Sequence, residues 1–435
     1  MPPGPTLYRS LIGTWNFIKD PINTLNRSME IYSGTFYSGK GIGQRVIVTQ
    51  HPDLINHVLK DNHRGYHKSA LATEKASKLM GNGILFTNGE FWLQQRRMIQ
   101  PAFHREKLQA LNGIITNAIS DSLNRFPVGD AVDICPFMHV MAFNVLLQSV
   151  FNIPLSTETA DEIMQLFEDI QQFLMNDATG VSRLFYYVTR ADKVARKKSA
   201  RLRAIIRGMV RQRQHQQGEN SDLLEMLMNS TYEDTGESMS EEQIIDEILI
   251  LIFAGHETTA NTLSWLLYLL ASNKPILKKL TASLSGNSAD AALANEYLRA
   301  TINEGMRLYP AAWMTERVAL EDDSSAGYSY PKGTIIISYL FGLHHDQGFW
   351  KEPWAFTPER FIDDPSIARS RHFYPFGAGP RMCVGNNFAI IEMSFFLSFF
   401  LQKYRIEPTG QVPTMKARIT LKPDKIILNT RCATN

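Results

Sequence analysis

Residues 376–385 read Phe-Gly-Ala-Gly-Pro-Arg-Met-Cys-Val-Gly and place a single cysteine, Cys383, between glycines and an apolar run. Glycine accepts backbone angles that other residues avoid, and proline supplies no N–H, so Gly377–Pro380 can continue neither a helix nor a central strand. The chain therefore turns sharply here. Backbone N–H groups and the start of the next helix favour negative charge at the sulfur, and the thiolate is the form of cysteine that binds metals. Arg381 adds a permanent cation with a planar fork suited to a carboxylate.

This turn resembles the haem-binding loop of the cytochrome P-450 superfamily, Phe-x-x-Gly-x-Arg-x-Cys-x-Gly, and every fixed position is filled. The resemblance implies that Cys383 is the axial thiolate ligand of haem iron, a ligand that favours O–O cleavage. It also places Phe376 and Arg381 in the cofactor site. The alternative is a buried structural cysteine on a glycine-rich turn, which leaves the other matched positions without a reason.

Composition describes an ordinary globular chain and excludes several classes of protein. The 435 residues are 44% hydrophobic and 20% charged, which argues against wholesale disorder. A formal net charge of +2 is too balanced to indicate a nucleic-acid partner. The three cysteines, Cys135, Cys383 and Cys432, have no paired spacing. They exclude a disulfide scaffold and a zinc finger and indicate a reducing compartment, the cytoplasm.

The start of the chain bears on its relation to membranes. No segment of the sequence reaches the ~18–20 continuous apolar residues that a membrane span needs. Met1-Pro2-Pro3-Gly4-Pro5 is neither a signal peptide nor a transit peptide. It resembles the proline-rich hinge that follows the membrane anchor in microsomal members of the family, here with no anchor before it. We therefore expect a soluble, monomeric protein of the bacterial type; the alternative is a chain from which an anchor was removed.

A long helix, predicted from about Ser240 to shortly before Pro275, is the second centre of chemistry. Ser240 and Gln243 fit a capping box at its start. Its middle is apolar except within residues 254–259, Ala-Gly-His-Glu-Thr-Thr. A buried acid and buried hydroxyls are costly unless they are bonded, and threonine hydroxyls loosen a helix when they bond the preceding turn.

Residues 254–259 resemble the family's Ala/Gly-Gly-x-Asp/Glu-Thr-Thr segment. The resemblance implies that Gly255 leaves room for O2 beside the iron and that Thr258 hydrogen-bonds the oxygen during its activation. It implies that Glu257 delivers protons, so that Thr258 and Glu257 are the catalytic pair. A helix kink without chemistry is the alternative.

Further resemblances place two more groups at the cofactor. Trp92 and Arg96 lie four residues apart on a helix predicted from about Glu90, so they share a face. Both are donors without acceptor capacity, which suits a carboxylate. The family's Trp-x-x-x-Arg pair binds a haem propionate; a surface pair is the alternative. The arginine that follows the extended stretch 311–315, Arg317, would meet the other propionate.

The expected substrate pocket is apolar and partly aromatic. Core packing explains the apolar tip Leu85–Phe86 equally well. The pocket residues implied by the resemblance are Leu85, Phe86, Ala254, Thr259, Trp313 and Met314.

Two other groups of charged residues are expected to be structural. Glu304 and Arg307, three apart on a helix, together with Arg360 resemble the family's buried Glu–Arg–Arg network, which pins the segment that holds the cysteine turn. The basic run at 190–213 has an apolar face, so it is predicted to be a solvated amphipathic helix rather than a nucleic-acid or membrane patch.

Patterning also predicts a hairpin over 31–50, helices over 51–59, 138–151, 161–176 and 388–401, loops over 215–241, and short strands near 404–430. The resemblance covers about residues 30–430. It implies one domain, 1–435, mainly α with small β-sheets, in the cytochrome P-450 fold. Haem b would lie between the long central helix and the cysteine-turn helix.

The implied reaction is a monooxygenation, in which one atom of O2 enters a small hydrophobic substrate by hydroxylation or epoxidation. The sequence holds no flavin, nicotinamide or iron–sulfur fingerprint. Two electrons would therefore come from separate proteins, a ferredoxin or flavodoxin with its reductase. Arg97, Arg105 and Lys107 are the expected docking residues. The alternatives are a peroxygenase or a dehydratase/isomerase on the same fold and, less directly, a haem gas sensor.

Overall fold

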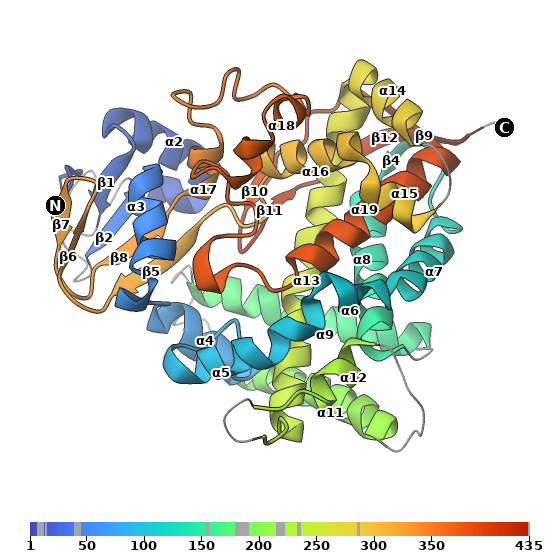
Figure 1. Cartoon of the computed structure of the whole chain (residues 1–435), viewed down its shortest axis with the longest axis horizontal. Helices are drawn as coiled ribbons and strands as arrows, with labels where there is room; N and C mark the ends of the chain where they lie inside the picture. Colours follow the sequence, from blue (N-terminus) through green and yellow to red (C-terminus); the bar gives the residue numbers. More distant parts are fainter. Residues whose placement is uncertain are drawn as a thin grey trace.

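The computed structural model describes residues 1–6, 13, 15–38, 45–152, 156–178, 191–214, 222–232, 236–284 and 288–433. Helices make up most of it (Figure 1). The largest sheet and the β6-β7 pair lie on the N-terminal side, whereas β4, β9 and β12 lie near the C-terminus. Helix α13 (Glu241–Ser272) runs through the middle of the molecule, and α19 (Asn386–Lys403), which follows the cysteine turn, crosses it. The prediction of a mainly helical fold with small sheets is confirmed.

The largest sheet carries one wall of the candidate site. Its five strands lie in the order β1-β2-β8-β5-β3. The predicted hairpin is confirmed as β1 antiparallel to β2, although its tip at 39–44 lies outside the described residues. The strands are β1 (Thr35–Ser38), β2 (Val46–Thr49), β3 (Tyr66–His67), β5 (Thr315–Ala319) and β8 (Ile335–Ser338).

The described residues form three smaller sheets, and β9, β10, β11 and β12 come from the region near 404–430 that the sequence assigned to short strands. The sheets are β4-β12-β9, formed by Gly129–Asp133, Ile427–Cys432 and Tyr404–Pro408, then β10-β11, formed by Met415–Ala417 and Leu421–Pro423, and β6-β7, formed by Asp323–Ser325 and Tyr328–Tyr330.

The other helices surround α13, which packs against α8, α11, α16 and α19. Their bounds are α2 (Pro21–Ile31), α3 (Pro52–Asn56), α4 (Ala70–Met80), α5 (Gly89–Ile99), α6 (Arg105–Gln109), α7 (Asn112–Leu123), α8 (Cys135–Phe151), α9 (Thr157–Ala178), α11 (Ala191–Gln214), α12 (Leu223–Met228), α14 (Lys274–Ser283), α15 (Ala289–Ala294), α16 (Glu296–Leu308), α17 (Leu340–His344) and α18 (Arg360–Asp363).

Helix α13 starts where its sequence predicts. Ser240 is the N-cap, and its Oγ accepts the Gln243 N–H at 3.2 Å. The Gln243 side chain does not return to Ser240 as in a full capping box; its Nε2 donates to Glu247 instead, at 2.9 Å. Helix α16 approaches α13 closely because it has a glycine at the crossing. A Cβ on Gly305 would lie 2.3 Å from Leu266 Cδ2.

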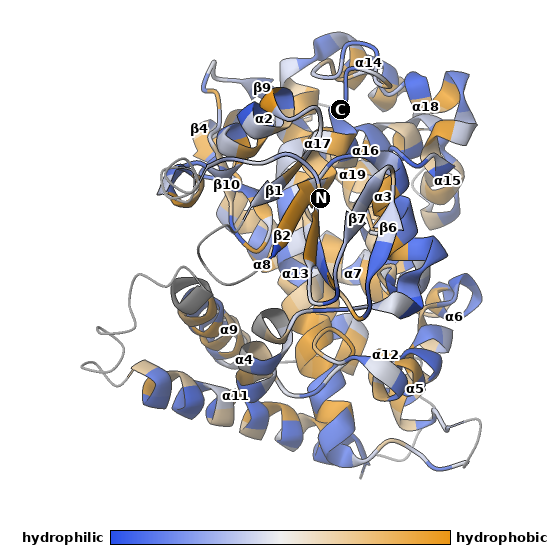
Figure 2. Cartoon of the chain, turned by 90° about the vertical axis from the view of Figure 1, so that its left-hand side faces the viewer, coloured by the Kyte–Doolittle hydropathy of each residue, from blue (hydrophilic) through white to orange (hydrophobic). Residues whose placement is uncertain are grey.

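The basic run differs from its prediction in one respect. Helix α11 has hydrophobic and hydrophilic residues along its length (Figure 2), and Leu202 and Ile206 are buried, so it is amphipathic. Its cations are not simply solvated, because several pair with acids of neighbouring helices. Lys198 pairs with Asp169 at 2.6 Å, and others pair with α13. These acids are distant in sequence, so the run looks unbalanced only when it is read locally.

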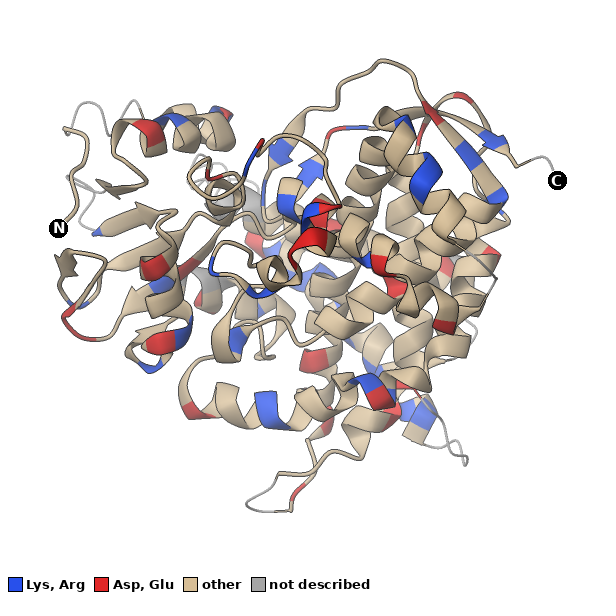
Figure 3. Cartoon of the chain, turned by 45° about the horizontal axis from the view of Figure 1, so that its top comes forward, with Lys and Arg blue, Asp and Glu red and all other residues tan. Residues whose placement is uncertain are grey.

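The prediction of loops over 215–241 needs correction. The region 215–241, assigned to loops, contains α12 within its described part. Charged residues of both signs are spread over many elements (Figure 3), in keeping with the net charge of +2.

His344 and His345 are buried, and burial lowers the pKa of each to about 3. The Tyr374 N–H donates to His344 Nε2 at 2.9 Å, and His345 Nδ1 donates to the Phe341 carbonyl at 2.8 Å, so both rings have structural partners.

Candidate active site

The cysteine turn is fixed by a close approach of two backbone segments. Gly379 has a φ of +68°, and a Cβ there would lie 1.9 Å from the Leu59 carbonyl oxygen. Leu59 belongs to a π-helical turn, His57–Asp61, that packs directly against this part of the cysteine turn. The Cys383 N–H donates to the Phe376 carbonyl at 2.9 Å, which closes the turn just before α19. Only glycine fits at position 379, which explains the first fixed glycine of the motif.

The Cys383 thiol borders an internal space. Burial raises its pKa, while a hydrogen bond from the Gly385 N–H and the charge of Arg96 act in the opposite direction. The residue nevertheless has an exposed surface. A side chain that is surrounded by protein and still accessible lies on the wall of a cavity. The N–H and the cation beside it favour a thiolate once a ligand shares the charge.

Helix α13 exposes a narrow face in its otherwise buried middle. Ala254 is exposed and Thr258 half-buried, one turn apart, whereas Phe253 and Thr259 are buried. The Thr258 hydroxyl donates back to the carbonyls of Ala254 (2.9 Å) and Gly255 (3.2 Å), the local bond that its sequence suggested. Accessible residues inside a buried helix indicate an internal cavity on that side.

Gly255 has a visible packing role. A Cβ there would lie 2.9 Å from Leu146 Cδ2 of α8, so the glycine lets two helices come together. Its predicted second role, making room for O2, stays a prediction.

Cations gather at the other side of the cysteine turn. Burial and the neighbouring Arg317 lower the pKa of Arg381 to about 10. The Arg381 guanidinium carbon lies 4.1 Å from the centre of the Trp92 ring, and Arg96 Nη1 donates to the Met382 carbonyl at 2.7 Å. Burial lowers the pKa of Arg317 as well. The sequence named all four of these residues, and they lie around the turn.

The sequence did not reveal two further members of this group, His67 and Lys68. Burial lowers the pKa of both; Arg381 acts on each of them, and Arg317 also on Lys68. They are brought here by β3, where His67 is the register partner of Val318 and so lies beside Arg317. A two-residue strand has no pattern of its own, so only the pairing could have identified them. Buried cations that raise one another's energy call for an anion.

Glu257 directly precedes Thr258 in α13, so its side chain is rotated by about 100° from that of Thr258. Its carboxylate accepts from Gln171 Nε2 at 2.9 Å and from the Thr420 hydroxyl at 3.0 Å, and Lys422 Nζ is 4.0 Å away. These groups border a polar cavity of about 280 Å³. Its lining residues are His139, Glu168, Gln171, Gln172, His256, Glu257, Arg418, Ile419 and Lys422. The acid is therefore connected to polar surroundings rather than directly to Thr258.

Among the predicted pocket residues, Leu85 and Phe86 are half-buried, and the Phe86 and Phe253 ring centres are 6.2 Å apart. Trp313 is buried, donates to the Arg418 carbonyl at 2.8 Å and belongs to a separate core cluster; its place in the pocket stays a prediction. Met314 is half-buried against the same cluster.

Thr259, another predicted pocket residue, has a structural partner. It is buried, and its hydroxyl hydrogen-bonds the carboxyl of Glu392 on α19. Burial raises the pKa of Glu392 well above its usual value. Thr259 therefore joins α13 to the cysteine helix, and its place in the pocket stays a prediction. Thr259 directly follows Thr258 in α13, so the two side chains point to different sides of the helix.

The Glu–Arg–Arg group forms a buried network. Arg307 Nε donates to Glu304 Oε2 at 2.7 Å, and its Nη2 donates to Glu304 Oε1 at 2.9 Å. Arg360 Nε reaches Glu304 Oε1 at 3.1 Å. Arg307 also donates to the carbonyls of His344 and Pro353, and these bonds tie α16 to the chain that leads toward the cysteine turn.

Comparison with known proteins decides the family: its model, described as Cytochrome P450, matches residues 2–430. The chain belongs to this family. Cyclooctat-9-en-7-ol 5-monooxygenase of Streptomyces melanosporofaciens is 29% identical over 84% of this chain and 81% of that protein. Pentalenene oxygenase of Streptomyces avermitilis is 26% identical over 88% and 87%. Cytochrome P450 3A12 of Canis lupus familiaris is 29% identical over 90% and 83%.

The fold agrees with solved structures of the family. The crystal structure of the cytochrome P450DA heme domain superposes with a TM-score of 0.88 at 22% identity, over 99% of this chain and 96% of that one. The chain is thus a cytochrome P450 monooxygenase, an enzyme that uses haem and O2 and receives electrons from a redox partner. None of the helices in the described part of the chain is long and apolar enough to cross a membrane.

The residues present fit a haem. Cys383 offers a sulfur at the wall of an internal space, and the buried cations Arg317, Arg381 and Lys68 match the two carboxylates that haem carries. When bound, haem supplies the iron that activates O2. The protein's own part would be to hold the thiolate with Gly385 N–H, to bind the carboxylates, and to present the Thr258 hydroxyl on the accessible face of α13.

Proposed function

We propose that this cytochrome P450 hydroxylates or epoxidises hydrocarbon-rich cyclic molecules of the terpene kind, with Cys383 as the iron ligand. The observation that carries the proposal is the accessible Cys383 thiol within a buried turn, with buried cations beside it. The apolar surroundings of Phe86 and Phe253 suit such a substrate. Two relatives are named for reactions on cyclooctat-9-en-7-ol and on pentalenene, which supports the substrate class.

The electron donor is proposed to be a separate acidic protein, a ferredoxin or flavodoxin reduced by its own reductase. Arg97 is exposed in the last turn of α5, and Arg105 and Lys107 are exposed in α6; together they supply the positive charge for it. Residues 1–435 are proposed to form a single haem domain, located in the cytoplasm.

Spectra of the haem-loaded protein test the ligand assignment. With carbon monoxide, the reduced protein should show the red-shifted Soret band of a thiolate ligand, and Cys383→Ala should abolish it. Cys432→Ala, a change of an exposed cysteine, is the matched control and should leave the band intact. A normal band in Cys383→Ala would contradict the assignment.

Substrates are then compared by the spin-state change they cause on binding. Pentalenene and cyclooctat-9-en-7-ol should bind more tightly than a linear fatty acid. Oxygenated products should form only with O2 and a reducing system. Product formed with hydrogen peroxide alone would favour a peroxygenase, and rearranged product without net oxidation a dehydratase or isomerase. Spectral binding of small gases without any turnover would favour a sensor.

A further inference from the structure

The loop from Gly81 to Asn88 carries Leu85 and Phe86, and two acids of α13 hold its beginning. The Asn82 N–H donates to Asp246 Oδ2 at 2.7 Å, and the Ile84 N–H donates to Glu247 Oε2 at 3.0 Å. Glu247 is fully buried. A hydrogen bond from a backbone N–H to a carboxylate such as Asp246 is stronger than a neutral one, and a buried acceptor such as the Glu247 carboxyl makes its hydrogen bond expensive to break.

The glycines of this loop are explained by the two acids. Gly81 has a φ of +87°, and a Cβ there would lie 2.1 Å from Asp246 Oδ1. A Cβ on Gly83 would lie 2.6 Å from Ile250 Cγ1 and 3.1 Å from Glu247 Oε2. The backbone must come this close for its N–H groups to reach the carboxylates. The sequence Gly-Asn-Gly thus fits a bound loop and not merely a flexible one.

The end of the loop is held by the cofactor-site cations. Lys68 Nζ donates to the Leu85 carbonyl, and Arg381 donates to the Thr87 carbonyl at 3.1 Å and to Asn88 Oδ1 at 3.0 Å. The loop is therefore tied to α13 at one end and to the cysteine turn at the other. Leu85 and Phe86 lie between these two attachments, and Phe86 faces Phe253 of α13.

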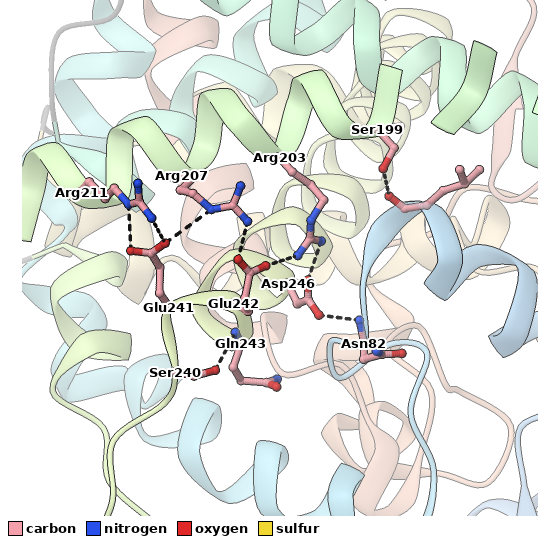
Figure 4. A network of polar contacts seen from close by, with 11 residues as sticks. Asn82, Ser199, Arg203, Arg207, Arg211, Ser240, Glu241, Glu242, Gln243 and Asp246 are labelled. Carbon is pink, nitrogen blue, oxygen red and sulfur yellow. Dashed lines mark hydrogen bonds and ion pairs between the residues drawn. The ribbon is translucent and has the colours of Figure 1, made fainter. Parts of the chain in front are cut away.

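A ladder of ion pairs extends the attachment to α11 (Figure 4). Arg203 donates to Asp246 Oδ1 at 2.6 Å and to Glu242 at 2.8 Å, so Asp246 serves α11 with one oxygen and the loop with the other. The side chains of Arg203 and Asp246 are 22% and 11% exposed. At the far end of the ladder Arg211, which is 60% exposed, pairs with Glu241. Exposed ion pairs contribute little to stability, so the Arg203–Asp246 pair at the inner end of the ladder is the one expected to hold the loop.

We propose that Asp246 and Glu247 are positioning residues for the substrate: they hold the backbone of residues 82–84 and thereby set where Leu85 and Phe86 stand in the pocket. Because Arg203 joins Asp246 to α11, the position of Leu85 and Phe86 should also depend on the position of α11. The inference rests on the proposed function in one respect, namely that Leu85 and Phe86 line the substrate space. The attachment itself does not depend on which substrate is bound.

Two readouts of the haem-loaded protein test the inference. In Asp246→Ala and Glu247→Leu, hydrogen exchange of a peptide covering 81–88 should become at least about tenfold faster, because a part-buried or buried hydrogen bond that holds the loop is lost. The spectral Kd for pentalenene should rise, and oxidation should spread over more positions of the substrate. Glu247→Gln keeps an acceptor for the Ile84 N–H and should restore the wild-type pattern.

Arg203→Met and Arg211→Met form a matched pair that leaves the buried acids in place. Arg203→Met should speed exchange in the loop, and Arg211→Met should not. The inference is overturned if exchange over 81–88 is unchanged in Glu247→Leu, or if Arg203→Met and Arg211→Met behave alike. If the wild-type protein gave no thiolate-type band, the proposed function would fail, whereas the exchange rates would still report on the attachment of the loop.

Discussion

The buried Glu304–Arg307–Arg360 network allows a graded test of how charge supports this fold. Arg307 is fully buried and makes two bonds to Glu304 and three to backbone carbonyls. In Arg307→Met, Glu304 keeps only Arg360 and the Thr357 N–H as partners. Removing one member of a buried ion pair leaves an uncompensated charge and costs ~3–5 kcal/mol.

The same acid provides its own comparison. Arg360 is 12% exposed in its side chain and makes one bond to Glu304, so Arg360→Met should cost only about 1.5–3 kcal/mol, as for a hydrogen bond to a charged group. Lys279 pairs with Glu359 at the surface, with its side chain 56% exposed, and Lys279→Met should cost at most about 1 kcal/mol. Urea unfolding of the haem-loaded proteins, followed by the thiolate-type Soret band, ranks the three by midpoint. Equal midpoints for Arg307→Met and Lys279→Met would refute the reasoning.

Three further outcomes are expected. Thr258→Ala should retain haem but divert electrons into hydrogen peroxide, because the hydroxyl on the accessible face of α13 is lost; full coupling of electrons to product would contradict this role. Reversing Arg97 and Lys107 to Glu should slow reduction by an acidic ferredoxin, less so at high salt, while Lys193→Glu on exposed α11 has no effect; equal slowing by both would misplace the docking face. Burial raises the pKa of Glu247 from 4.5 to about 8. The folded protein therefore keeps a proton that the unfolded chain releases, and stability should fall from pH 4.5 to 8; a thermal unfolding series should show a smaller fall for Glu247→Gln.

The local sequence was sufficient to predict the features that depend on neighbouring residues alone. The cysteine turn was predictable because Gly379 must approach a carbonyl that no side chain could tolerate. The start and end of α13 followed from Ser240, from the long apolar stretches on both sides of residues 254–259, and from Pro275. Trp92 and Arg381 were predicted as cofactor residues from motifs far apart in sequence, and the structure stacks one on the other.

The sequence did not predict the features of the site that depend on contacts between distant segments. His67 and Lys68 join the cation cluster only through the pairing of β3 with β5, and no pattern in a two-residue strand predicts that register. Trp313 was assigned to the pocket because residues 311–315 resemble a strand that lines the family's pocket, and the structure places its side chain in a core cluster with Tyr339 and Phe341. Arg203 appeared to be part of an unbalanced basic run because its partners lie about forty residues away, on α13.

The cation cluster links the cofactor to the completion of the fold. Lys68, Arg317 and Arg381 are buried together. The charges of Arg317 and Arg381 lower the pKa of Lys68, with Glu316 acting in the opposite direction, and the charge of Arg317 lowers the pKa of Arg381. Without an anion, this arrangement costs free energy that β3 and β5 must supply through their few pairings. A bound dianionic cofactor makes the electrostatic free energy of these cations favourable. Any ligand that binds only the folded state also adds its binding free energy to the stability of the protein. The sheet edge that carries His67 and Lys68 should therefore be the part of the site that depends most on the cofactor, whereas Gly379 and Leu59, which meet through backbone contact, should hold the cysteine turn in either state.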